Sequence, residues 1–282
     1  MIEIIRAGAL TTVQDLGRPG WAHLGVPRSG ALDAPALRLA NRLVGNPDEC
    51  AGLETTVTGC ALRLHRAAIV AVTGADARVR VSKEVVDAGA PIAVPAGALV
   101  EIGPARSGVR SYIAIDGGIA VEPVLGSRST DTLSGLGPAP LRDGDVLPLG
   151  PANPPPPAAA RAVREPPPAE LELPVLLGPR DDWFTPEAIE TFLTTPYTVG
   201  MMSNRVGVRL SGAPLERARV GELPSEGVVL GAVQVPGDGQ PLVFLADHPT
   251  TGGYPVIAVV TDVTPLAQAR PGATVRFRGP QR

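Results

Sequence analysis

This chain of 282 residues is poor in the features that several functional classes need. It has a single lysine, Lys83, its arginines are scattered, and only 3% of its residues are aromatic. Neither a basic face nor a base-stacking surface is therefore predicted, which argues against nucleic-acid binding. No apolar run approaches the ~20 residues of a membrane-spanning helix. The N-terminal stretch, which includes Glu3, does not resemble a secretory signal. We expect a soluble, cytoplasmic protein that does not bind membranes.

Cysteine and histidine are also scarce. Cys50 and Cys60 cannot complete a four-ligand metal site alone, and His23, His65 and His248 are far apart in the sequence. The chain contains no G-x-x-x-x-G-K-[ST] loop, no G-x-S-x-G elbow, no H-E-x-x-H and no C-x-x-C. We expect two buried or half-buried, unreactive thiols, no metal site and no obvious covalent nucleophile.

Glycine and proline are abundant, at 33 and 32 residues, and the net charge is −3. Frequent turns and a core of Val, Leu, Ile and Ala favour short β-strands. Strands are predicted in "AAIVAVTG", "ARVRVS", "SYIAIDGG", "VVLGAVQVP", "LVFLAD", "PVIAVVTD" and "TVRFR", and "PGDGQP" predicts a hairpin. Each half also predicts one helix, capped by Asp33 before "APALRLANRLVG" and by Thr185 before "PEAIETFL".

A proline-rich segment divides the chain. "GPANPPPPAAARAVREPPPAE" begins at Gly150, and proline cannot join the interior of a sheet because it has no N–H donor. The sequence predicts an N-terminal β domain over residues 1–150, an extended linker over 151–170 and a C-terminal β domain over 171–282.

Three glycine-rich stretches concentrate polar side chains. The first, Thr11–Asp33, is poor core material and predicts a surface that holds a polar ligand. The others are Tyr197–Gly212 and Pro224–Pro255. Such residues often only satisfy backbone groups in turns. Together they also suit a small, planar ligand with C=O and N–H edges. The candidate binding residues are Gln14, Arg18, Ser29, Ser203, Asn204, Arg205, Ser225, Glu226, Gln234, Gln240, Thr251, Gly252 and Gly253, and the candidate catalytic residues are Asp15, Asp247 and Tyr254.

These stretches, with "LANRLVGN", "GLETTVTG", "AIDGGIAVEPVLGSRSTDT" and "TTGGYPVIAVV", resemble the family called allophanate hydrolase subunit 2, or the biotin-dependent carboxyltransferase A/B domain, which includes the C subunit of 5-oxoprolinase. The resemblance spans nearly the whole chain. It departs from the family pattern at Leu32, Asn204, His248 and Pro249, where methionine, aspartate, arginine and glutamine are more usual.

The resemblance implies two cyclophilin-like β-barrel domains, with the first ribbon and strands of the second half sharing a ligand pocket. It also implies a subunit of an ATP-dependent 5-oxoprolinase, which opens 5-oxoproline to glutamate. The implied partners are the A subunit of 5-oxoprolinase and its B subunit, a companion related to allophanate hydrolase subunit 1. Two alternatives remain: a biotin-dependent carboxyltransferase subunit of the urea carboxylase type, or a non-catalytic regulator that binds a kinase-inhibitor-like partner.

Under the main interpretation the polar residues receive roles. Arg18 or Arg205 would pair with the substrate carboxylate, and Gln14 and Gln234 would bind the lactam edge. Asp15 or Asp247 would act as general base. The backbone amides of Gly252 and Gly253, beside Tyr254, would stabilise developing negative charge.

Overall fold

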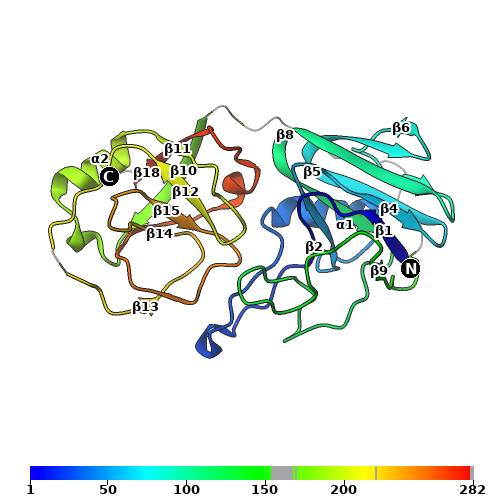
Figure 1. The fold of residues 1–282 in the computed structure, drawn as a ribbon, viewed down its shortest axis with the longest axis horizontal. Coiled ribbons are helices and arrows are strands. Elements are labelled where there is room, and N and C mark those ends of the chain that lie inside the picture. Colours follow the sequence, from blue (N-terminus) through cyan, green and yellow to red (C-terminus); the bar gives the residue numbers. More distant parts are fainter. Residues whose placement is uncertain (154–167, 169, 220, 280–282) are drawn as a thin grey trace. The chain divides into compact units, whose positions relative to one another are not determined.

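The computed structural model describes residues 1–153, 168, 170–219 and 221–279 of the chain (Figure 1). These residues form two compact units: the first contains residues 1–18 and 29–153, and the second contains 19–28 and residues from 168 onward. The short segment Pro19–Arg28 thus belongs with the second unit, a feature that the sequence does not predict. Most of the predicted linker, 151–170, lies outside the described residues.

The first unit is built on a nine-stranded, curled sheet. Its central path runs β2-β3-β8-β4-β1-β9, and β5 pairs with β6, β7 and β8. The strands are β1 (Ile2–Arg6), β2 (Thr11–Gln14), β3 (Gly52–Thr56), β4 (Ala61–Leu64), β5 (Ala68–Val81), β6 (Glu84–Val86), β7 (Ile92–Val94), β8 (Leu99–Ile115) and β9 (Val146–Leu147). Buried Ile, Leu and Val side chains from most of these strands form one core.

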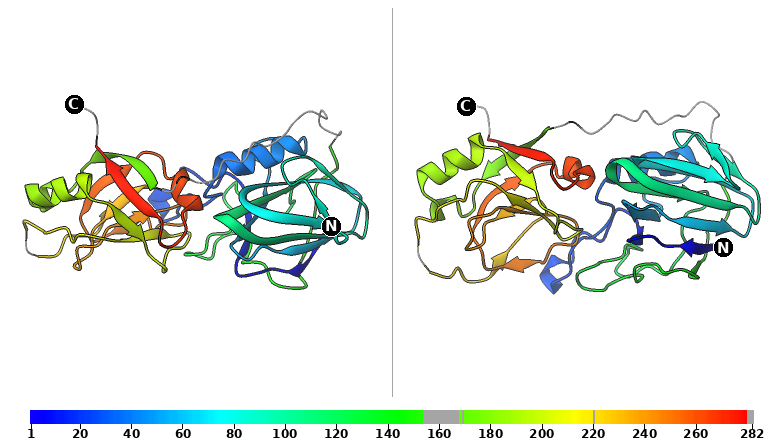
Figure 2. Two further views of the ribbon diagram at one scale, coloured as in Figure 1. Left: turned by 90° about the horizontal axis from the view of Figure 1, so that it is seen from above. Right: turned by 45° about the horizontal axis from the view of Figure 1, so that its top comes forward.

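The two longest strands, β5 and β8, run antiparallel side by side (Figures 1 and 2). "AAIVAVTG" and "ARVRVS" are parts of this single strand β5 rather than two strands. Gly74 joins them: its φ of 80° is accessible to glycine, and the register with β8 shifts just after it. The glycine therefore bends the strand without ending it.

Helix α1 (Ala34–Leu43) begins and ends as the sequence predicts. The Asp33 side chain accepts a hydrogen bond from the Ala36 N–H, and Gly45 has a positive φ just beyond the end of the helix. Leu37 and Ala40 are fully buried on the apolar face. The helix packs against β5 and β8, which places its N-terminus beside the end of the first glycine-rich stretch.

The second unit contains a closed barrel with the strand order β10-β17-β14-β15-β12-β11-β18. These strands are β10 (Glu170–Leu177), β11 (Tyr197–Val199), β12 (Gly207–Ser211), β14 (Ala232–Gln234), β15 (Leu242–Phe244), β17 (Val256–Val260) and β18 (Thr274–Arg278). β13 (Glu226–Gly227) and β16 (Thr251–Gly252) form a separate two-stranded sheet. The predicted hairpin at "PGDGQP" is confirmed, since it joins the antiparallel strands β14 and β15.

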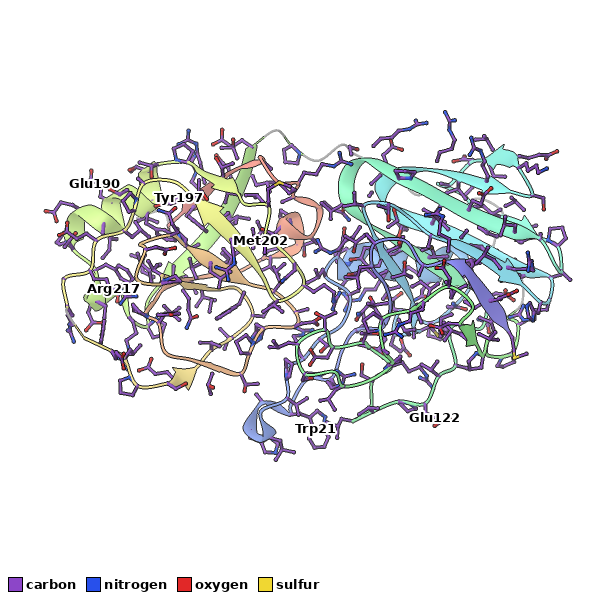
Figure 3. The ribbon with its side chains drawn as sticks, in the orientation of Figure 1. Trp21, Glu122, Glu190, Tyr197, Met202 and Arg217 are labelled. Atoms are coloured by element: carbon purple, nitrogen blue, oxygen red, sulfur yellow. The ribbon has the colours of Figure 1, made fainter. Side chains whose placement is uncertain are left out.

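Helix α2 (Pro186–Thr194) is capped by Thr185, whose side chain accepts a hydrogen bond from the Ala188 N–H, as predicted. Its Phe192 ring stacks on Phe277 of β18 at a centroid distance of 4.2 Å. Figure 3 shows Tyr197, which completes this aromatic cluster, among the side chains of the second unit.

The described residues also include three short 3-10 helices: η1 (Ala22–Leu24), η2 (Asp181–Trp183) and η3 (Thr264–Gln268). None of the helices among them combines the length and the apolar character needed to cross a bilayer. The prediction of a mainly β chain with one principal helix in each half is confirmed. The second unit closes into a barrel, and the sheet of the first unit is a curled half-barrel.

Candidate functional site

The two ends of the first glycine-rich stretch are largely buried, whereas its middle, Pro19–Arg28, is mostly exposed, so the surface ribbon predicted from its composition is found only in that middle part. Strand β2 is buried at all four positions, and Asp15, Arg18 and Ser29 are buried after it. Polar side chains tolerate burial when each finds a hydrogen-bond partner. Here most of the partners come from the segment 124–130 of the same unit, and we call the assembly of Gln14, Asp15, Arg18, Ser29 and this segment the Gln14 cluster.

Asp15 anchors this segment. Its carboxylate accepts hydrogen bonds from the Ser127 and Ser129 hydroxyls, both at 2.6 Å, and from the backbone N–H groups of Gly17 and Arg128 at 2.7 and 2.6 Å. Four donors occupy both of its oxygens. The geometry therefore favours a structural role for Asp15 over the general-base role predicted from the sequence.

Arg18 is also held by its own unit. Its guanidinium donates to the backbone oxygens of Val124 and Ser129 and to the Ser29 hydroxyl, the latter at 3.2 Å. The side chain is 1% exposed. Arg18 thus ties the Ser29 turn to the 124–130 segment, and this arrangement does not favour the predicted pairing with a substrate carboxylate.

Gln14 has an unsatisfied group in this cluster. Its Nε2 donates to the Thr12 hydroxyl and to the Thr130 backbone oxygen, both at 3.0 Å. Its Oε1 and the neighbouring Thr130 Oγ1 are buried and have no hydrogen-bond partner among the described residues. Such an oxygen is costly to bury unless something donates to it. Gln14 is therefore the predicted binding residue of this cluster whose side chain keeps an acceptor without a donor.

In the second unit, Arg205 and Asp247 pair with each other. Two parallel hydrogen bonds of 2.9 Å join the Arg205 Nε and Nη2 to the two Asp247 oxygens, and both residues are buried. A bidentate pair of this kind occupies the guanidinium fork and both carboxylate oxygens. The pairing therefore does not favour the predicted binding of a substrate carboxylate by Arg205. It also does not favour the predicted role of Asp247 as general base.

Three other predicted residues make turns, as the alternative interpretation of such residues expects. Ser203 Oγ donates to the Gly200 oxygen and accepts from the Arg209 N–H. Asn204 Oδ1 accepts from the N–H groups of Val206 and Gly207. Gln240 binds both backbone groups of Gly212, accepting its N–H at 2.8 Å and donating to its C=O at 3.2 Å. Gln240 does recognise an amide edge, but that edge belongs to its own chain.

A second group of predicted residues does come together at the end of β14. The Gln234 Nε2 donates to the Tyr254 backbone oxygen at 3.0 Å, and a Cβ on Gly252 would lie only 2.4 Å from that nitrogen. Gly252 pairs in turn with Glu226 between β16 and β13. The Glu226 carboxylate accepts hydrogen bonds from the Nε and Nη2 groups of Arg180. We call Arg180, Glu226, Gln234, Gly252 and Tyr254 the Gln234 cluster.

Charge in the Gln234 cluster is balanced and partly open to solvent. Hydrogen bonds from Arg180 lower the pKa of the Glu226 carboxyl, and the same bonds raise the pKa of Arg180. Tyr254 is half exposed, and Gly253, Thr251 and Ser225 are exposed. The cluster therefore offers a buried amide beside an accessible aromatic ring and backbone.

Several residues of these clusters were not predicted from the sequence. They are Arg180, Ser127, Ser129 and Thr130, although "LLGPRDD" and "GSRSTDT" place them next to glycine-containing turns. A buried network beneath α1 was not predicted either. There the Tyr112 hydroxyl donates to Glu54 Oε2 at 2.8 Å and accepts from the Asp33 N–H at 2.8 Å, and Arg110 lies 3.6 Å from Glu54.

The pKa of the Tyr112 hydroxyl in this network is strongly shifted. Burial raises the pKa of Tyr112 well above its usual value, and the Glu54 carboxylate adds to the effect. Burial likewise raises the pKa of Cys60 to about 11 and raises the pKa of half-buried Cys50. Cys50 and Cys60 are both free thiols, in the buried and half-buried positions that were predicted.

Comparison with known proteins places these clusters in context. A family model described as carboxyltransferase domain, subdomain A and B, matches residues 24–279. The C subunit of 5-oxoprolinase from Escherichia coli (strain K12) is 39% identical over 286 residues, which cover 98% of this chain and 90% of that protein. The urea amidolyase of Saccharomyces cerevisiae (strain ATCC 204508 / S288c) is 36% identical over 302 residues, but the match covers only 16% of the amidolyase.

Solved structures agree with these matches. The crystal structure of the Kluyveromyces lactis urea carboxylase superposes with a TM-score of 0.89 and 33% identity. The superposition covers 98% of this chain and 27% of the carboxylase. One compact stretch of a much longer protein thus has the same fold as this entire chain.

Proposed function

Since this chain belongs to the family of the carboxyltransferase domain, subdomain A and B, we propose that it is a subunit of an ATP-dependent 5-oxoprolinase. One observation carries the proposal. The C subunit of the E. coli 5-oxoprolinase is 39% identical over 98% of this chain, whereas the yeast urea amidolyase is 36% identical over the same share. The match covers 90% of the C subunit, which supports the function of that subunit for this chain.

The proposed reaction opens a lactam. A lactam is a stabilised amide. Transfer of the terminal phosphoryl group of ATP to the carbonyl oxygen, with release of ADP, would make the ring carbon electrophilic. Water would then attack that carbon, the ring C–N bond would break, and phosphate would leave. What this chain would contribute is binding and orientation of the small ring. The buried Oε1 of Gln14 is an acceptor suited to the ring N–H, and Gln234 presents an amide edge beside the accessible Tyr254.

Neither cluster fits the nucleotide itself. Phosphate groups need free cationic forks or open backbone amides. In the Gln14 cluster Arg18 donates to backbone oxygens, and in the Gln234 cluster Arg180 is paired with Glu226. We therefore propose no ATP-binding role for either cluster. ATP would be held elsewhere in the complex.

The proposed partners are the A subunit of 5-oxoprolinase and its B subunit, the companion related to allophanate hydrolase subunit 1. The name of the E. coli relative supports this proposal, since it designates one subunit of several.

Carboxyltransferase chemistry is the second candidate, and the family description and the yeast relative favour it. The ureido ring of biotin presents the same C=O and N–H edges as a lactam, so the Gln14 and Gln234 amides would suit it as well. The higher identity to the C subunit of 5-oxoprolinase, 39% against 36%, is what ranks 5-oxoprolinase first. A regulatory role remains a third possibility that the clusters also suit.

The test is turnover by the reconstituted complex of three subunits, measured as glutamate and ADP release from 5-oxoproline and ATP. Gln14→Ala and Gln234→Ala are each expected to lower kcat/KM at least about tenfold, the equivalent of one buried hydrogen bond to substrate. Gln240→Ala is the matched control, because the Gln240 amide is already engaged by Gly212, and it should retain turnover.

Two outcomes would contradict the proposal in different ways. If both glutamine variants kept wild-type turnover, the binding assignment would be wrong. If the wild-type complex ignored 5-oxoproline but carboxylated urea with biotin and bicarbonate, the function itself would be wrong.

A further inference from the structure

One pocket of the first unit is lined by four arginines. Arg6, Arg78, Arg80 and Arg106 surround a concave space of about 350 Å³, and the rest of its lining is Glu101, Gly103 and Pro104. All four arginine side chains are exposed. The sequence analysis predicts no basic face, because these residues are spread over 101 positions of the chain.

The strand geometry explains how they gather. Arg78 and Arg80 are two residues apart on β5, so their side chains share one face, while Val79 between them is buried on the other. Opposite them, Ala105 pairs with Ala77 and Ile102 pairs with Val79. Two residues of β8, Gly103 and Pro104, therefore face the single residue Arg78.

This two-against-one arrangement is a β-bulge. Pro104 suits it because proline has no N–H to give to the strand ladder. A bulge bends the strand on which it lies. Arg106 follows two residues later on β8, and Arg6 comes from the end of β1.

Among the residues that the structure describes, the positive charge of this pocket is offset only in part, since four arginines share the lining with one carboxylate. The Arg6 guanidinium makes only long contacts, 3.4 and 3.5 Å, to the backbone oxygens of Thr58 and Ile102. Within the described part of the chain, Arg78, Arg80 and Arg106 form no ion pair. Glu101, opposite Arg80 in the register, is the one carboxylate of the lining.

The chemistry of the lining indicates the ligand. Like charges held in one pocket repel each other, and an anion between them removes that cost. Each guanidinium presents a planar fork that matches two oxygens of a phosphate group. The lining has no aromatic or large aliphatic side chain of the kind that anchors a docked protein. A compact anion with several phosphate groups suits the pocket better than a protein surface.

We propose that the pocket formed by Arg6, Arg78, Arg80 and Arg106 binds a compact polyanion of the phosphate class, such as tripolyphosphate or the phosphate chain of a nucleotide. The site is separate from the Gln14 and Gln234 clusters. It does not depend on which reaction the complex carries out, so its test and that of the proposed function can fail independently.

Isothermal titration of the full-length chain with tripolyphosphate tests this site. At about 20 mM salt we expect saturable binding with one site per chain, which weakens as salt rises because exposed charges are screened. The double variant Arg78→Glu/Arg80→Glu should bind at least about tenfold more weakly, since two charge-assisted contacts are lost.

The matched control is Arg38→Glu/Arg209→Glu. It changes the net charge equally at two exposed arginines outside the pocket, and it should bind like the wild-type chain. Circular dichroism would confirm that both variants are folded. Arg106→Ala repeats the test from β8, and this variant should also bind more weakly.

Parallel titrations with ATP and orthophosphate separate the possible sources of the anion. Equal affinity for ATP and tripolyphosphate would identify the phosphate chain as the ligand. Tighter binding of ATP would show that the nucleoside also contacts the pocket. The proposal is overturned if none of the three anions binds saturably, or if the control variant weakens binding as much as the pocket variant. It is also overturned if Arg78→Glu/Arg80→Glu binds the anions like the wild-type chain but binds the companion subunit more weakly, because the surface would then recognise a protein.

Discussion

At the scale of single residues, burial changes what a polar side chain can do. Asp15, Arg18, Arg205 and Asp247 have the residue types of a catalytic site, yet each is engaged by groups of its own unit. A buried carboxylate or guanidinium that is hydrogen-bonded within its own unit stabilises the local structure. The amide of Gln14 differs, because one of its atoms remains unpartnered.

Asp247→Asn should reveal a structural role for this pair. Removing the charge takes the carboxylate partner from the 1% exposed Arg205, and breaking a buried pair in this way costs about 3–5 kcal/mol. Urea denaturation should show that loss. Asp182→Asn is the control, since its pair with Arg219 is about half exposed on both sides and should contribute less than about 1 kcal/mol. A folded, fully stable but inactive Asp247→Asn complex would instead support the general-base role.

The cysteines should be unreactive at neutral pH. Burial raises the pKa of Cys60 from 9.0 to about 11, so the folded state favours the thiol over the thiolate. Its contribution to stability is therefore complete below pH 9 and is lost as the pH rises through about 11. Native protein should resist a thiol reagent at Cys60 at pH 8 and react after unfolding.

Replacing both cysteines with alanine should leave turnover of the complete complex largely unchanged. The double variant should also lose less stability than the wild-type chain between pH 9 and 11, as followed by thermal melts. Loss of turnover in a folded Cys50→Ala/Cys60→Ala variant would show that a thiol takes part in the reaction.

At the scale of elements, turns and strand ends do most of the positioning. Helix α1 is joined to the sheet by Tyr112, whose hydroxyl connects the Asp33 backbone at the N-cap to Glu54 on β3. In the second unit, glycine at position 252 of β16 leaves room for the Gln234 amide of β14, which lies where a Cβ would stand. Each contact links residues that are far apart in the sequence.

Tyr112→Phe should loosen the attachment of α1. The change removes the acceptor of the buried Asp33 N–H and one of the donors to Glu54, which still accepts from the Leu32 N–H, at a cost of about 1–3 kcal/mol. Tyr197→Phe is the matched control, because that hydroxyl makes one longer bond of 3.3 Å to the Ala213 oxygen. Chemical denaturation should show a larger loss in the free energy of unfolding for Tyr112→Phe than for Tyr197→Phe. Equal losses would mean that the hydrogen bonds of the Tyr112 hydroxyl stabilise the protein no more than the single bond of Tyr197.

Gly252→Ala should disturb the Gln234 cluster. The new Cβ would lie 2.4 Å from the Gln234 Nε2, which is closer than van der Waals contact allows and forces that amide to move. We expect a loss of at least about tenfold in kcat/KM if Gln234 binds substrate. Gly237→Ala is the control, since nothing lies within 4 Å of its Cβ position. Unchanged turnover in Gly252→Ala would count against a binding role for Gln234.

At the scale of the whole molecule, the similarity to a C subunit of 5-oxoprolinase predicts that the chain works in an assembly. We expect co-expression with the companion subunit to give one co-eluting peak in size-exclusion chromatography, because stable interfaces bury on the order of 1,600 Å². Each protein expressed alone serves as the reference. Two separate peaks at micromolar concentration would argue against the complex. The division into domains at 151–170 also stays a prediction, since residues 154–167 lie outside those described.

The sequence by itself determined the mainly β fold, the two capped helices, the β14–β15 hairpin and the family. These features follow from local signals: apolar periodicity, Asp33 and Thr185 at the caps, and turn residues such as those of "PGDGQP". Only the tertiary structure decided which polar residues satisfy one another. Whether Arg205 meets Asp247 or a ligand, and whether Arg78 lies near Arg106, depends on strand pairing between distant segments. The same residue types can close a turn or hold a substrate, and what separates the two is the set of partners that folding brings within hydrogen-bonding distance.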